Sequence, residues 1–327
     1  MTNTDFLDLS AEDTLHLLEE AERLFQAGYP ANFYEGAPLL VGTLFRNEGR
    51  YEKGVSEAAA GRLGGTVNQF TWPDSFTLSM QEKLDELSLV ANATDILLSA
   101  QVNEDTFGNG RLVTELMATE TPIDFISLHD DIYAHQSALA VLSAVKSRLG
   151  KLDRKRIAIS WGFGSRFVLP STAHSILALA TKLGSDVRVV APSKFSLLHR
   201  VYRDALEMAK KHDSTVEQVD TFEETFPDVD AIFALNWGSF DNFSHPERNA
   251  SDARGFEDWC FTSDIMPDNS LFVTEPPVRR DLLASSDLLV SKANLTREWL
   301  ARRVAVLVST IRFILGTDDE DKPTVFI

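Results

Sequence analysis

The stretch that decides the fold is Phe45–Gly65, FRNEGRYEKGVSEAAAGRLGG, which follows the apolar run APLLVGTLF at Ala37–Phe45. The apolar run predicts a buried strand, and the Ala-rich segment that ends in two glycines predicts a helix. A short loop with Arg46, Arg50 and Lys53 joins them. Free N–H groups and the helix dipole favour an anion at such a helix start, so we predict an anion site. A solvated helix start is the alternative interpretation.

Length and composition are those of a globular protein with room for two domains: 327 residues, 44% hydrophobic and 24% charged. The formal charge of −18 argues against nucleic acid as a partner, although a few arginines in a cleft still permit small anionic ligands. No apolar run approaches the ~20 residues of a membrane span, and the N-terminus is acidic where a targeting peptide would be basic. The single cysteine, Cys260, fits a reducing compartment. We therefore expect a cytoplasmic protein with no membrane partner.

Strand and helix patterns alternate along the whole chain. The first half predicts strands over 37–45, 66–70, 93–100 and 122–129, and helices that start at Ser10 or cover 79–92, 112–118 and 134–149. The second half predicts strands over 156–161, 186–192, 230–237 and 270–276, and helices over 171–183, 197–211 and 295–315. Such alternation predicts an α/β protein with two doubly wound parallel sheets, each covered on both faces.

A family resemblance begins with the frame Phe-x(11)-Glu that starts at Phe45 and precedes the Ala-rich helix and Leu-Gly-Gly. This frame resembles the carbamoyl-phosphate loop of aspartate and ornithine carbamoyltransferases, which carry Ser-Thr-Arg-Thr-Arg within it. The same five places here read Gly49, Arg50, Tyr51, Glu52 and Lys53, and the resemblance makes Gly49, Arg50, Tyr51 and Lys53 candidate donor-binding residues. The bidentate arginine forks are lost, and a lysine does not reproduce them. Glu52 would repel phosphate unless it pairs with Arg50 or Lys53.

The resemblance covers nearly the whole chain and implies two domains joined by interdomain helices. Residues 1–135, completed by the helix 295–316, form a carbamoyl-phosphate-type donor domain, residues 136–294 form an amine-acceptor domain, and 317–327 form a tail. The loop 161–172, WGFGSRFVLPST, and the later Trp237-Gly238 resemble the knotted acetylornithine and succinylornithine carbamoyltransferases. A trefoil knot in the second domain is therefore expected. The family also implies a homotrimer with sites at the subunit interfaces.

The tetrapeptide Tyr133-Ala134-His135-Gln136 resembles the family's His-Pro-x-Gln, whose His and Gln contact the carbonyl and the amide of the carbamoyl group. Gln136 is kept, Tyr133 replaces the His, and His135 stands at the x position. A tyrosine O–H can still donate to an oxyanion, so Tyr133 and Gln136 are candidate catalytic residues and His135 a donor-binding one. A capped helix start with a buried tyrosine is the other interpretation.

The heptapeptide TEPPVRR, 274–280, resembles the family's His-Cys-Leu-Pro-x-x-Arg. Arg280 falls on the family's Arg and is the third candidate catalytic residue. Arg279 lies beside it, as in the acetylornithine subgroup. Pro277 matches a proline whose preceding peptide is cis in relatives. Glu275 replaces a cysteine that contacts the acceptor, which implies a different or cationic acceptor group.

Two further segments complete the implied site. Asn236 and Trp237, at the end of a predicted strand, are candidates for acceptor binding, although Leu235 stands where ornithine-type enzymes have an Asp. Glu82 matches the Lys-Gly-Glu-Ser type loop that a neighbouring subunit contributes, and Lys83 is the residue expected to reach that neighbour's site.

No cofactor is expected. Gly162 and Gly164 form G-x-G, but the third glycine of a dinucleotide fingerprint is missing. The histidines outside the implied site show no ligand spacing, so no metal site is predicted.

Two functions follow from these residues. The first is a transcarbamylase-like transferase of amino acid metabolism that moves a carbamoyl or related acyl group to the amine of a small amino-acid-like acceptor, with an altered donor site. The second is a paralogue that keeps the fold but acts as a ligand-binding or scaffold protein. Losing one preorganised oxyanion donor typically costs ~10²–10³ in rate, so efficient transfer from carbamoyl phosphate is not expected. Another reaction in the same cleft also stays open.

Overall fold

The computed structural model describes residues 9–29, 37–46, 50–71, 78–102, 106–120, 124–222 and 226–317. The chain divides into two compact units, which we call unit 1 (Met1–Ala140 and Leu300–Ile327) and unit 2 (Val141–Trp299). The divisions fall inside two helices, α5 (His135–Leu149) and α10 (Thr296–Ile314). The expected limits at 135 and 295 lie at the starts of the same helices, and the donor and acceptor roles of the two domains stay predictions.

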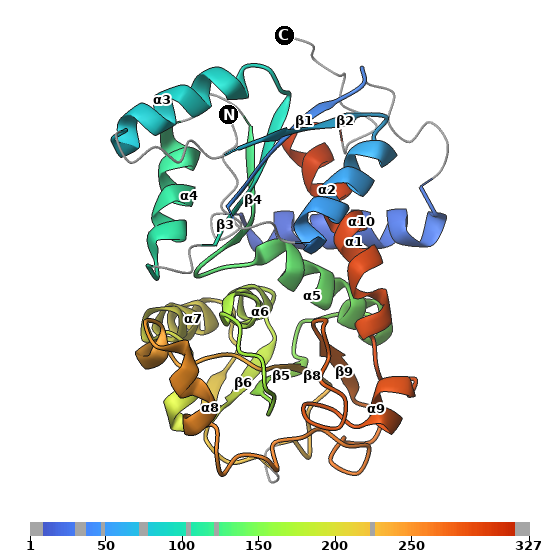
Figure 1. Ribbon diagram of the computed structural model, residues 1–327. Helices are drawn as coiled ribbons and strands as arrows, with labels where there is room; N and C mark the ends of the chain where they lie inside the picture. The colour runs from blue at the N-terminus through green and yellow to red at the C-terminus, as the bar shows by residue number, and fades with distance from the viewer. Residues whose placement is uncertain are drawn as a thin grey trace. The chain divides into compact units, whose positions relative to one another are not determined.

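Unit 1 is built on a four-stranded parallel sheet in the order β2-β1-β3-β4. Its strands are β1 (Leu40–Arg46), β2 (Thr66–Phe70), β3 (Ile96–Gln101) and β4 (Phe125–Asp130). Its other helices are α1 (Ala11–Ala27), α2 (Arg50–Arg62), α3 (Met80–Ala91) and α4 (Asn109–Glu120). Figure 1 shows α3 and α4 on one side of the strands and α2 and α10 on the other, as expected for a doubly wound sheet.

Burial explains why the sequences of the strands in unit 1 are mostly apolar. Every residue of β3 is buried, which is typical of a parallel strand covered on both faces. On the α3–α4 side, Leu44, Leu97 and Phe125 from three strands pack with apolar residues of these helices. The helix residues in this cluster are Leu84, Leu87, Val113 and Met117. The cluster fastens both helices to one face of the sheet.

Helix α1 begins where the sequence predicts it. Ser10 is the N-cap, and its Oγ accepts a hydrogen bond from the Asp13 backbone N–H at 2.9 Å, while Asp13 accepts from the Ser10 backbone N–H. This reciprocal capping box satisfies two of the free N–H groups at the helix start. The helix ends at Gly28, whose φ of 67° is the left-handed conformation that glycine favours.

The C-terminal helix α10 supplies three buried arginines to unit 1. Arg302 bonds Glu22 at 2.5 Å and Arg303 bonds Glu52 at 2.9 Å. Arg312 pairs with Glu20. Buried arginines require such carboxylate partners, because an unpaired buried charge is costly. These pairs tie the last helix to α1 and α2, near the other end of the chain.

Unit 2 is built on a five-stranded parallel sheet in the order β7-β6-β5-β8-β9. The strands are β5 (Arg156–Trp161), β6 (Asp186–Val190), β7 (Val216–Val219), β8 (Ala231–Leu235) and β9 (Leu271–Thr274). The helices are α6 (Ser171–Lys182), α7 (His199–Lys211), α8 (Asn249–Asp252) and α9 (Ser286–Val290), with short 3-10 turns η1 (Ser193–Phe195), η3 (Phe240–Asn242) and η4 (Pro246–Arg248). The predicted α/β class with two parallel sheets is confirmed.

The prediction omitted β7 and the short helices α8 and α9. Strand β7 has the sequence VEQV and lies at the edge of the described sheet, where it pairs with β6. An edge strand is held by backbone pairing, so it need not carry the apolar pattern that marks a buried strand. Helices α8 and α9 have only four and five residues, too few to show a helical period.

The two loops expected to cross in unit 2 lie against each other. Val168 forms a parallel bridge with Trp237, donates its N–H to the Asn236 carbonyl at 3.2 Å and accepts from Gly238 N–H at 3.0 Å. The Trp161 indole N–H donates to the Trp237 carbonyl at 2.9 Å. The loop after β5 and the segment after β8 are therefore bonded side by side, and the threading that would make a knot stays a prediction.

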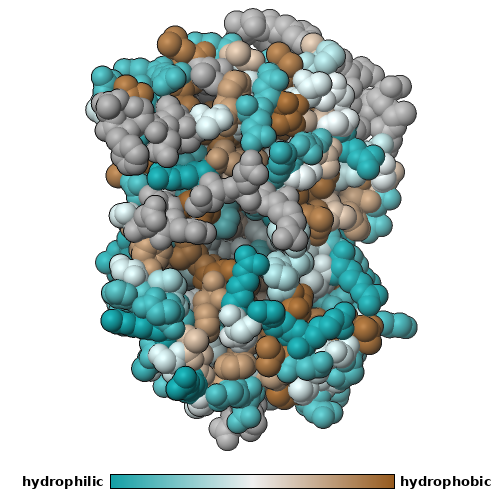
Figure 2. Space-filling model, viewed as in Figure 1, coloured by the Kyte–Doolittle hydropathy of each residue, from teal (hydrophilic) through white to brown (hydrophobic). Residues whose placement is uncertain are grey.

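The molecular face drawn in Figure 2 is mainly hydrophilic, with hydrophobic residues dispersed among polar ones. Within the ranges described above, no helix combines the length and the apolar character that a membrane crossing requires.

Candidate functional site

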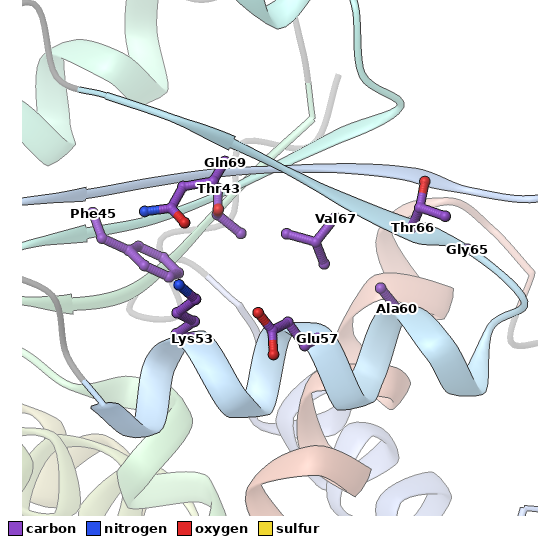
Figure 3. Close-up of a pocket in the computed structure, with 9 residues that line it drawn as sticks. All are labelled: Thr43, Phe45, Lys53, Glu57, Ala60, Gly65, Thr66, Val67 and Gln69. Carbon is purple, nitrogen blue, oxygen red and sulfur yellow. The ribbon is translucent and has the colours of Figure 1, made fainter.

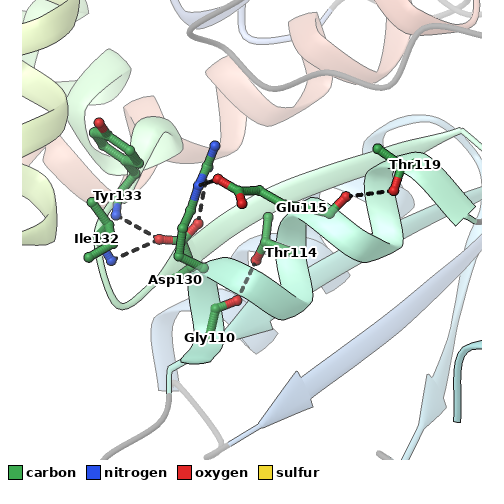
Figure 4. Close-up of polar contacts among 8 residues, drawn as sticks. Gly110, Thr114, Glu115, Thr119, Asp130, Ile132 and Tyr133 are labelled. Carbon is green, nitrogen blue, oxygen red and sulfur yellow. Dashed lines mark hydrogen bonds and ion pairs between the residues drawn. The ribbon is translucent and has the colours of Figure 1, made fainter. Parts of the chain in front are cut away.

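The turn between β4 and α5 is organised by the Asp130 carboxylate (Figure 4). Its Oδ1 accepts hydrogen bonds from the backbone N–H groups of Ile132 and Tyr133, both at 2.8 Å. Its Oδ2 lies 3.4 Å from Nη1 of Arg111, whose Nε donates to Glu115 at 2.8 Å. The carboxylate thus accepts hydrogen bonds from the backbone N–H groups of a tight turn and sets the position from which α5 starts.

Tyr133 and His135 form a stacked pair with ring centroids 4.9 Å apart. Both side chains are buried, and the Arg111 guanidinium lies 5.2 Å from the centre of the Tyr133 ring. The ring of Tyr133 therefore contacts both an imidazole and a cation. The structure brings these two predicted residues together, and the role of the Tyr133 hydroxyl as an oxyanion donor stays a prediction.

Two buried glutamines in unit 1 leave a carbonyl oxygen without a donor among the described residues. Gln136, 1% exposed, donates its Nε2 to Thr310 of α10 at 3.0 Å, and its Oε1 accepts nothing there. Gln101, also 1% exposed, donates to the Leu44 carbonyl at 3.1 Å, and its Oε1 is likewise unmatched. A buried acceptor without a donor is costly, and an N–H or O–H group of a bound molecule would satisfy each of these oxygens.

Gln101 is a residue that the sequence analysis missed. It is the last residue of β3, where it pairs in register with Arg46 of β1 and Asp130 of β4. The sequence carried a signal for it, because an amide ends a largely apolar buried run at the carboxyl edge of a parallel sheet. Ligands bind at such edges in open α/β sheets.

Glu52 at the start of α2 has a partner that the sequence did not suggest. Its carboxylate is bonded by Arg303 of α10 at 2.9 Å, whereas Arg50 and Lys53 are the candidate partners near it in the sequence. Glu52 is 8% exposed, and Lys53 is exposed on another side of the helix. Successive helical residues differ by about 100° in direction, so neighbours in the sequence face different surroundings. Arg303 was missed because it is 251 residues away in the chain.

Glu52 remains ionised although it is buried. Burial raises the pKa of a carboxyl group, but here the charges of Arg303 and His129 and the hydrogen bonds from Arg303 and from the Glu52 backbone N–H outweigh burial. The pKa of Glu52 consequently lies below its usual value. The start of α2 therefore holds a negative charge of its own.

Lys53 lines a separate hollow of about 340 Å³ between α2 and the strands β1 and β2 (Figure 3). Glu57, one turn further along α2, also lines it, and Phe45, Val67 and Gln69 are among its other lining residues. Lys53 is thus directed away from the buried Glu52–Arg303 pair. Its predicted role in anion binding stays a prediction.

The remaining residues of the altered loop are described in part. Gly49 lies outside the described residues, and Arg50 is the first residue of α2, described by its backbone alone. Tyr51 is half-buried in the first turn of the helix. Their donor-binding roles stay predictions.

In unit 2, Asn236 is a buried amide just beyond the end of β8. Its Nδ2 donates to the Gly162 carbonyl at 2.7 Å, and its Oδ1 accepts no hydrogen bond from the described residues. Gly164 packs against this amide, because a Cβ at Gly164 would lie 3.1 Å from Asn236 Oδ1. Trp237 is fully buried and donates its indole N–H to the Phe195 carbonyl at 2.7 Å. Trp237 is thus a core residue, and its predicted contact with an acceptor gains no support from this position.

The TEPPVRR segment follows β9. Thr274 is buried, and its Oγ1 has no partner among the described residues. Glu275 accepts a hydrogen bond from Thr172 at 2.9 Å. The peptide between Pro276 and Pro277 is cis, as the resemblance implies.

The two arginines that end this segment are exposed. Arg279 donates to the Ser165 hydroxyl in the loop after β5, and Arg280 forms an isolated bridge with Ala284. The catalytic role of Arg280 and the acceptor role of Arg279 stay predictions.

Glu82 caps α3. Its Oε2 accepts hydrogen bonds from the backbone N–H and the hydroxyl of Ser79, both at 2.7 Å, and these bonds lower the pKa of Glu82. The sequence S-x-x-E at this point is a capping-box signal that explains Glu82 without a second subunit. Lys83 is half-buried beside it. The contribution of either residue to a neighbouring subunit stays a prediction.

Comparison with known proteins shows that this chain is similar to carbamoyltransferases. The profile of the aspartate/ornithine carbamoyltransferase Asp/Orn binding domain matches residues 169–304. The Escherichia coli (strain K12) protein named "Putative carbamoyltransferase YgeW" is 28% identical over 119 residues, 35% of this chain and 30% of that protein, so the match spans less than a third of the relative. The ornithine carbamoyltransferase of Ignicoccus hospitalis is 25% identical over 257 residues, 77% of this chain and 78% of the relative.

Solved structures show the same fold. N-acetyl-L-ornithine transcarbamylase bound to carbamyl phosphate and N-succinyl-L-norvaline superposes with a TM-score of 0.83 at 18% identity, covering 94% of this chain and 98% of the other. Acetylornithine transcarbamylase complexed with acetylcitrulline gives 0.82 at 19% identity, covering 94% and 97%. At these identities the likeness concerns the fold.

Proposed function

Because the chain belongs to the aspartate/ornithine carbamoyltransferase superfamily, we propose that it is a transcarbamylase-like transferase with an altered donor site. It moves a carbamoyl or related acyl group to the amine of a small amino-acid-like acceptor. Such a reaction needs little covalent help from a protein: the amine attacks a carbonyl, charge builds on its oxygen, and a leaving group departs. The protein's task is to position both reactants and to offer donors to that oxygen.

The unmatched buried oxygens at the carboxyl ends of β8 and β9 carry this proposal. Thr274 pairs in register with Ala234, two residues before Asn236, so these polar residues lie on neighbouring parallel strands. Asn236 Oδ1 and Thr274 Oγ1 both lack partners among the described residues. An amine supplies N–H donors to such acceptors. The adjacent Glu275 carboxylate favours an acceptor that carries a positive group.

Unit 1 supplies the donor side. The Oε1 atom of Gln136 can accept from the amide of a carbamoyl group, and the Tyr133 hydroxyl can donate to the oxygen on which charge develops. We also propose a homotrimeric assembly, which rests on the family resemblance.

The test is a search for the transfer product. Purified protein is incubated with amino acids and their N-acyl derivatives, together with either carbamoyl phosphate or a neutral ureido compound, and the ureido product is detected by mass spectrometry. We expect product with at least one pair. Asn236→Leu should raise KM for the amine, and Gln136→Leu should lower kcat, by about tenfold or more because each loses a hydrogen bond to a buried partner. Gln81→Leu on the exposed face of α3 is the matched control.

A ligand-binding protein without transfer activity is the second candidate. The ionised Glu52 at the start of α2, bonded to Arg303, favours it, because it opposes a phosphate-bearing donor. Amine binding that depends on Asn236, with no product from any donor, would support this second candidate and contradict the first.

A further inference from the structure

The start of α2 is a position where an anion is stabilised. The N–H groups in the first turn of an α-helix have no acceptor within the helix, and the helix dipole places partial positive charge at the start of the 13-residue α2. Glu52 is the third residue of α2, in this first turn, and its buried carboxylate is bonded by Arg303. The Glu52 carboxylate therefore occupies the place at the start of α2 where a bound anion would be stabilised.

Arg303, the cation bonded to Glu52, already has this carboxylate as its partner. Arg303 is 2% exposed, and its Nη2 bonds Glu52 Oε1 at 2.9 Å. A phosphate group entering here would bring up to two negative charges against a buried carboxylate, and would have to take Arg303 from it. Like charges in a buried site are strongly unfavourable, so the pair excludes phosphate unless Glu52 is removed.

Two buried oxygens of unit 1 lack donors among the described residues. Gln101 Oε1, at the carboxyl edge of the sheet between β1 and β4, and Gln136 Oε1, at the start of α5, accept no hydrogen bond from the described residues. The –NH₂ of a carboxamide, a ureido compound or a carbamoyl group has two hydrogens to donate to such acceptors. Carbamoyl phosphate also carries this –NH₂, so it is the charge of its phosphate group beside Glu52 that separates it from a neutral compound.

We infer that Glu52 is an internal anion that replaces a bound phosphate, so that unit 1 takes a neutral carboxamide or ureido compound instead of an acyl phosphate. The inference rests on the proposed function, because it names the chemical class of the group donor. It concerns binding alone, and so it can be tested without turnover.

The first experiment measures phosphate binding by thermal shift and calorimetry in the wild type and two variants. Glu52→Thr removes the internal anion, and Glu86→Thr removes the same charge from an exposed position on α3. We expect 10 mM phosphate to leave the melting temperature of the wild type and of Glu86→Thr unchanged. It should raise that of Glu52→Thr, with phosphate affinity at least tenfold higher than in the wild type, because Arg303 and the helix start become available.

A second Glu52 variant keeps the test valid if Glu52→Thr does not fold. Glu52→Thr leaves Arg303 without its carboxylate, whereas Glu52→Gln keeps an oxygen that can accept from Arg303 and removes only the charge. A gain of phosphate affinity is expected here too, because the repelling charge is gone, but it should be smaller than in Glu52→Thr, because Arg303 keeps an oxygen to bond. Wild-type protein that binds phosphate as tightly as a folded Glu52 variant would overturn the inference, and so would folded variants that gain no affinity.

The second experiment uses neutral probes, N-methylurea and acetamide, in ligand-observed NMR. Saturation transfer to both probes is expected in the wild type and should be lost in Gln136→Leu but kept in Gln81→Leu. Binding of carbamoyl phosphate with no response to the neutral probes would contradict the inference. If transfer then proceeds from carbamoyl phosphate, the proposed function holds while this inference fails. If the neutral probes bind but no transfer product forms, this inference holds while the proposed function fails.

Discussion

At the scale of single residues, the ion pairs of unit 1 differ from those elsewhere in their burial. Arg303 and Glu52 have side chains 2% and 11% exposed, whereas Arg148 and Glu298 in unit 2 are 52% and 27% exposed. Water screens the second pair and not the first. The free-energy cost of breaking each pair should differ accordingly.

Arg303→Ala should lower the free energy of unfolding by about 3–5 kcal/mol, because it leaves an uncompensated buried carboxylate. Arg148→Ala, the control, should cost about 1 kcal/mol or less. Urea denaturation followed by circular dichroism measures both. Equal costs in the two variants would show that the Arg303–Glu52 pair is not buried as described.

Glu52 also predicts a dependence of stability on pH. A carboxyl group whose pKa is lowered by folding adds stability above its unfolded pKa, about 4.3, and loses it as the pH falls through the lower folded value. The stability difference between the wild type and Glu52→Gln should therefore be full at pH 7 and shrink below about pH 4.3. Melting temperatures from pH 7 to pH 3 test this. A difference that is constant over this range would contradict the lowered pKa.

At the scale of elements, α4 starts unusually close to the end of β3. The backbone N–H of Gly110 donates to Asp131 Oδ2 at 2.6 Å, and a Cβ at Gly110 would lie 1.7 Å from the Gln101 carbonyl oxygen. Only glycine allows this approach. The contact places α4 beside the Asp130 turn that positions α5.

Gly110→Ala should therefore be severely destabilising, by about 4 kcal/mol or more, because helix and strand must separate. Gly61→Ala is the matched control: it lies within α2 with nothing inside 4 Å of its would-be Cβ, so it should stabilise by roughly 0.5–1 kcal/mol. Denaturation midpoints of both variants test the contrast. A Gly110→Ala protein as stable as the wild type would refute the close approach.

At the scale of the whole molecule, the resemblance predicts a trimer. Light scattering should give a mass of about three times the 36.4 kDa of the chain. Glu82→Ala should weaken α3 through loss of its cap and leave the mass unchanged, since the bonds described for Glu82 are to Ser79. A monomer at micromolar concentration would remove the trimer proposal, and dissociation on Glu82→Ala would assign that residue to the interface.

The sequence by itself determined the α/β class, the two parallel sheets, the start of α1 at Ser10 and strands such as 66–70 and 156–161, whose bounds agree with β2 and β5. These features depend on residues close together in the chain, so the periodicity of apolar residues and the capping residues that mark them can be recognised in the sequence. Only the tertiary structure decided the partner of Glu52, the unmatched oxygens of Gln101 and Asn236, and the burial of Trp237. Each depends on contacts with backbone or side chains distant in the sequence, which no local pattern encodes.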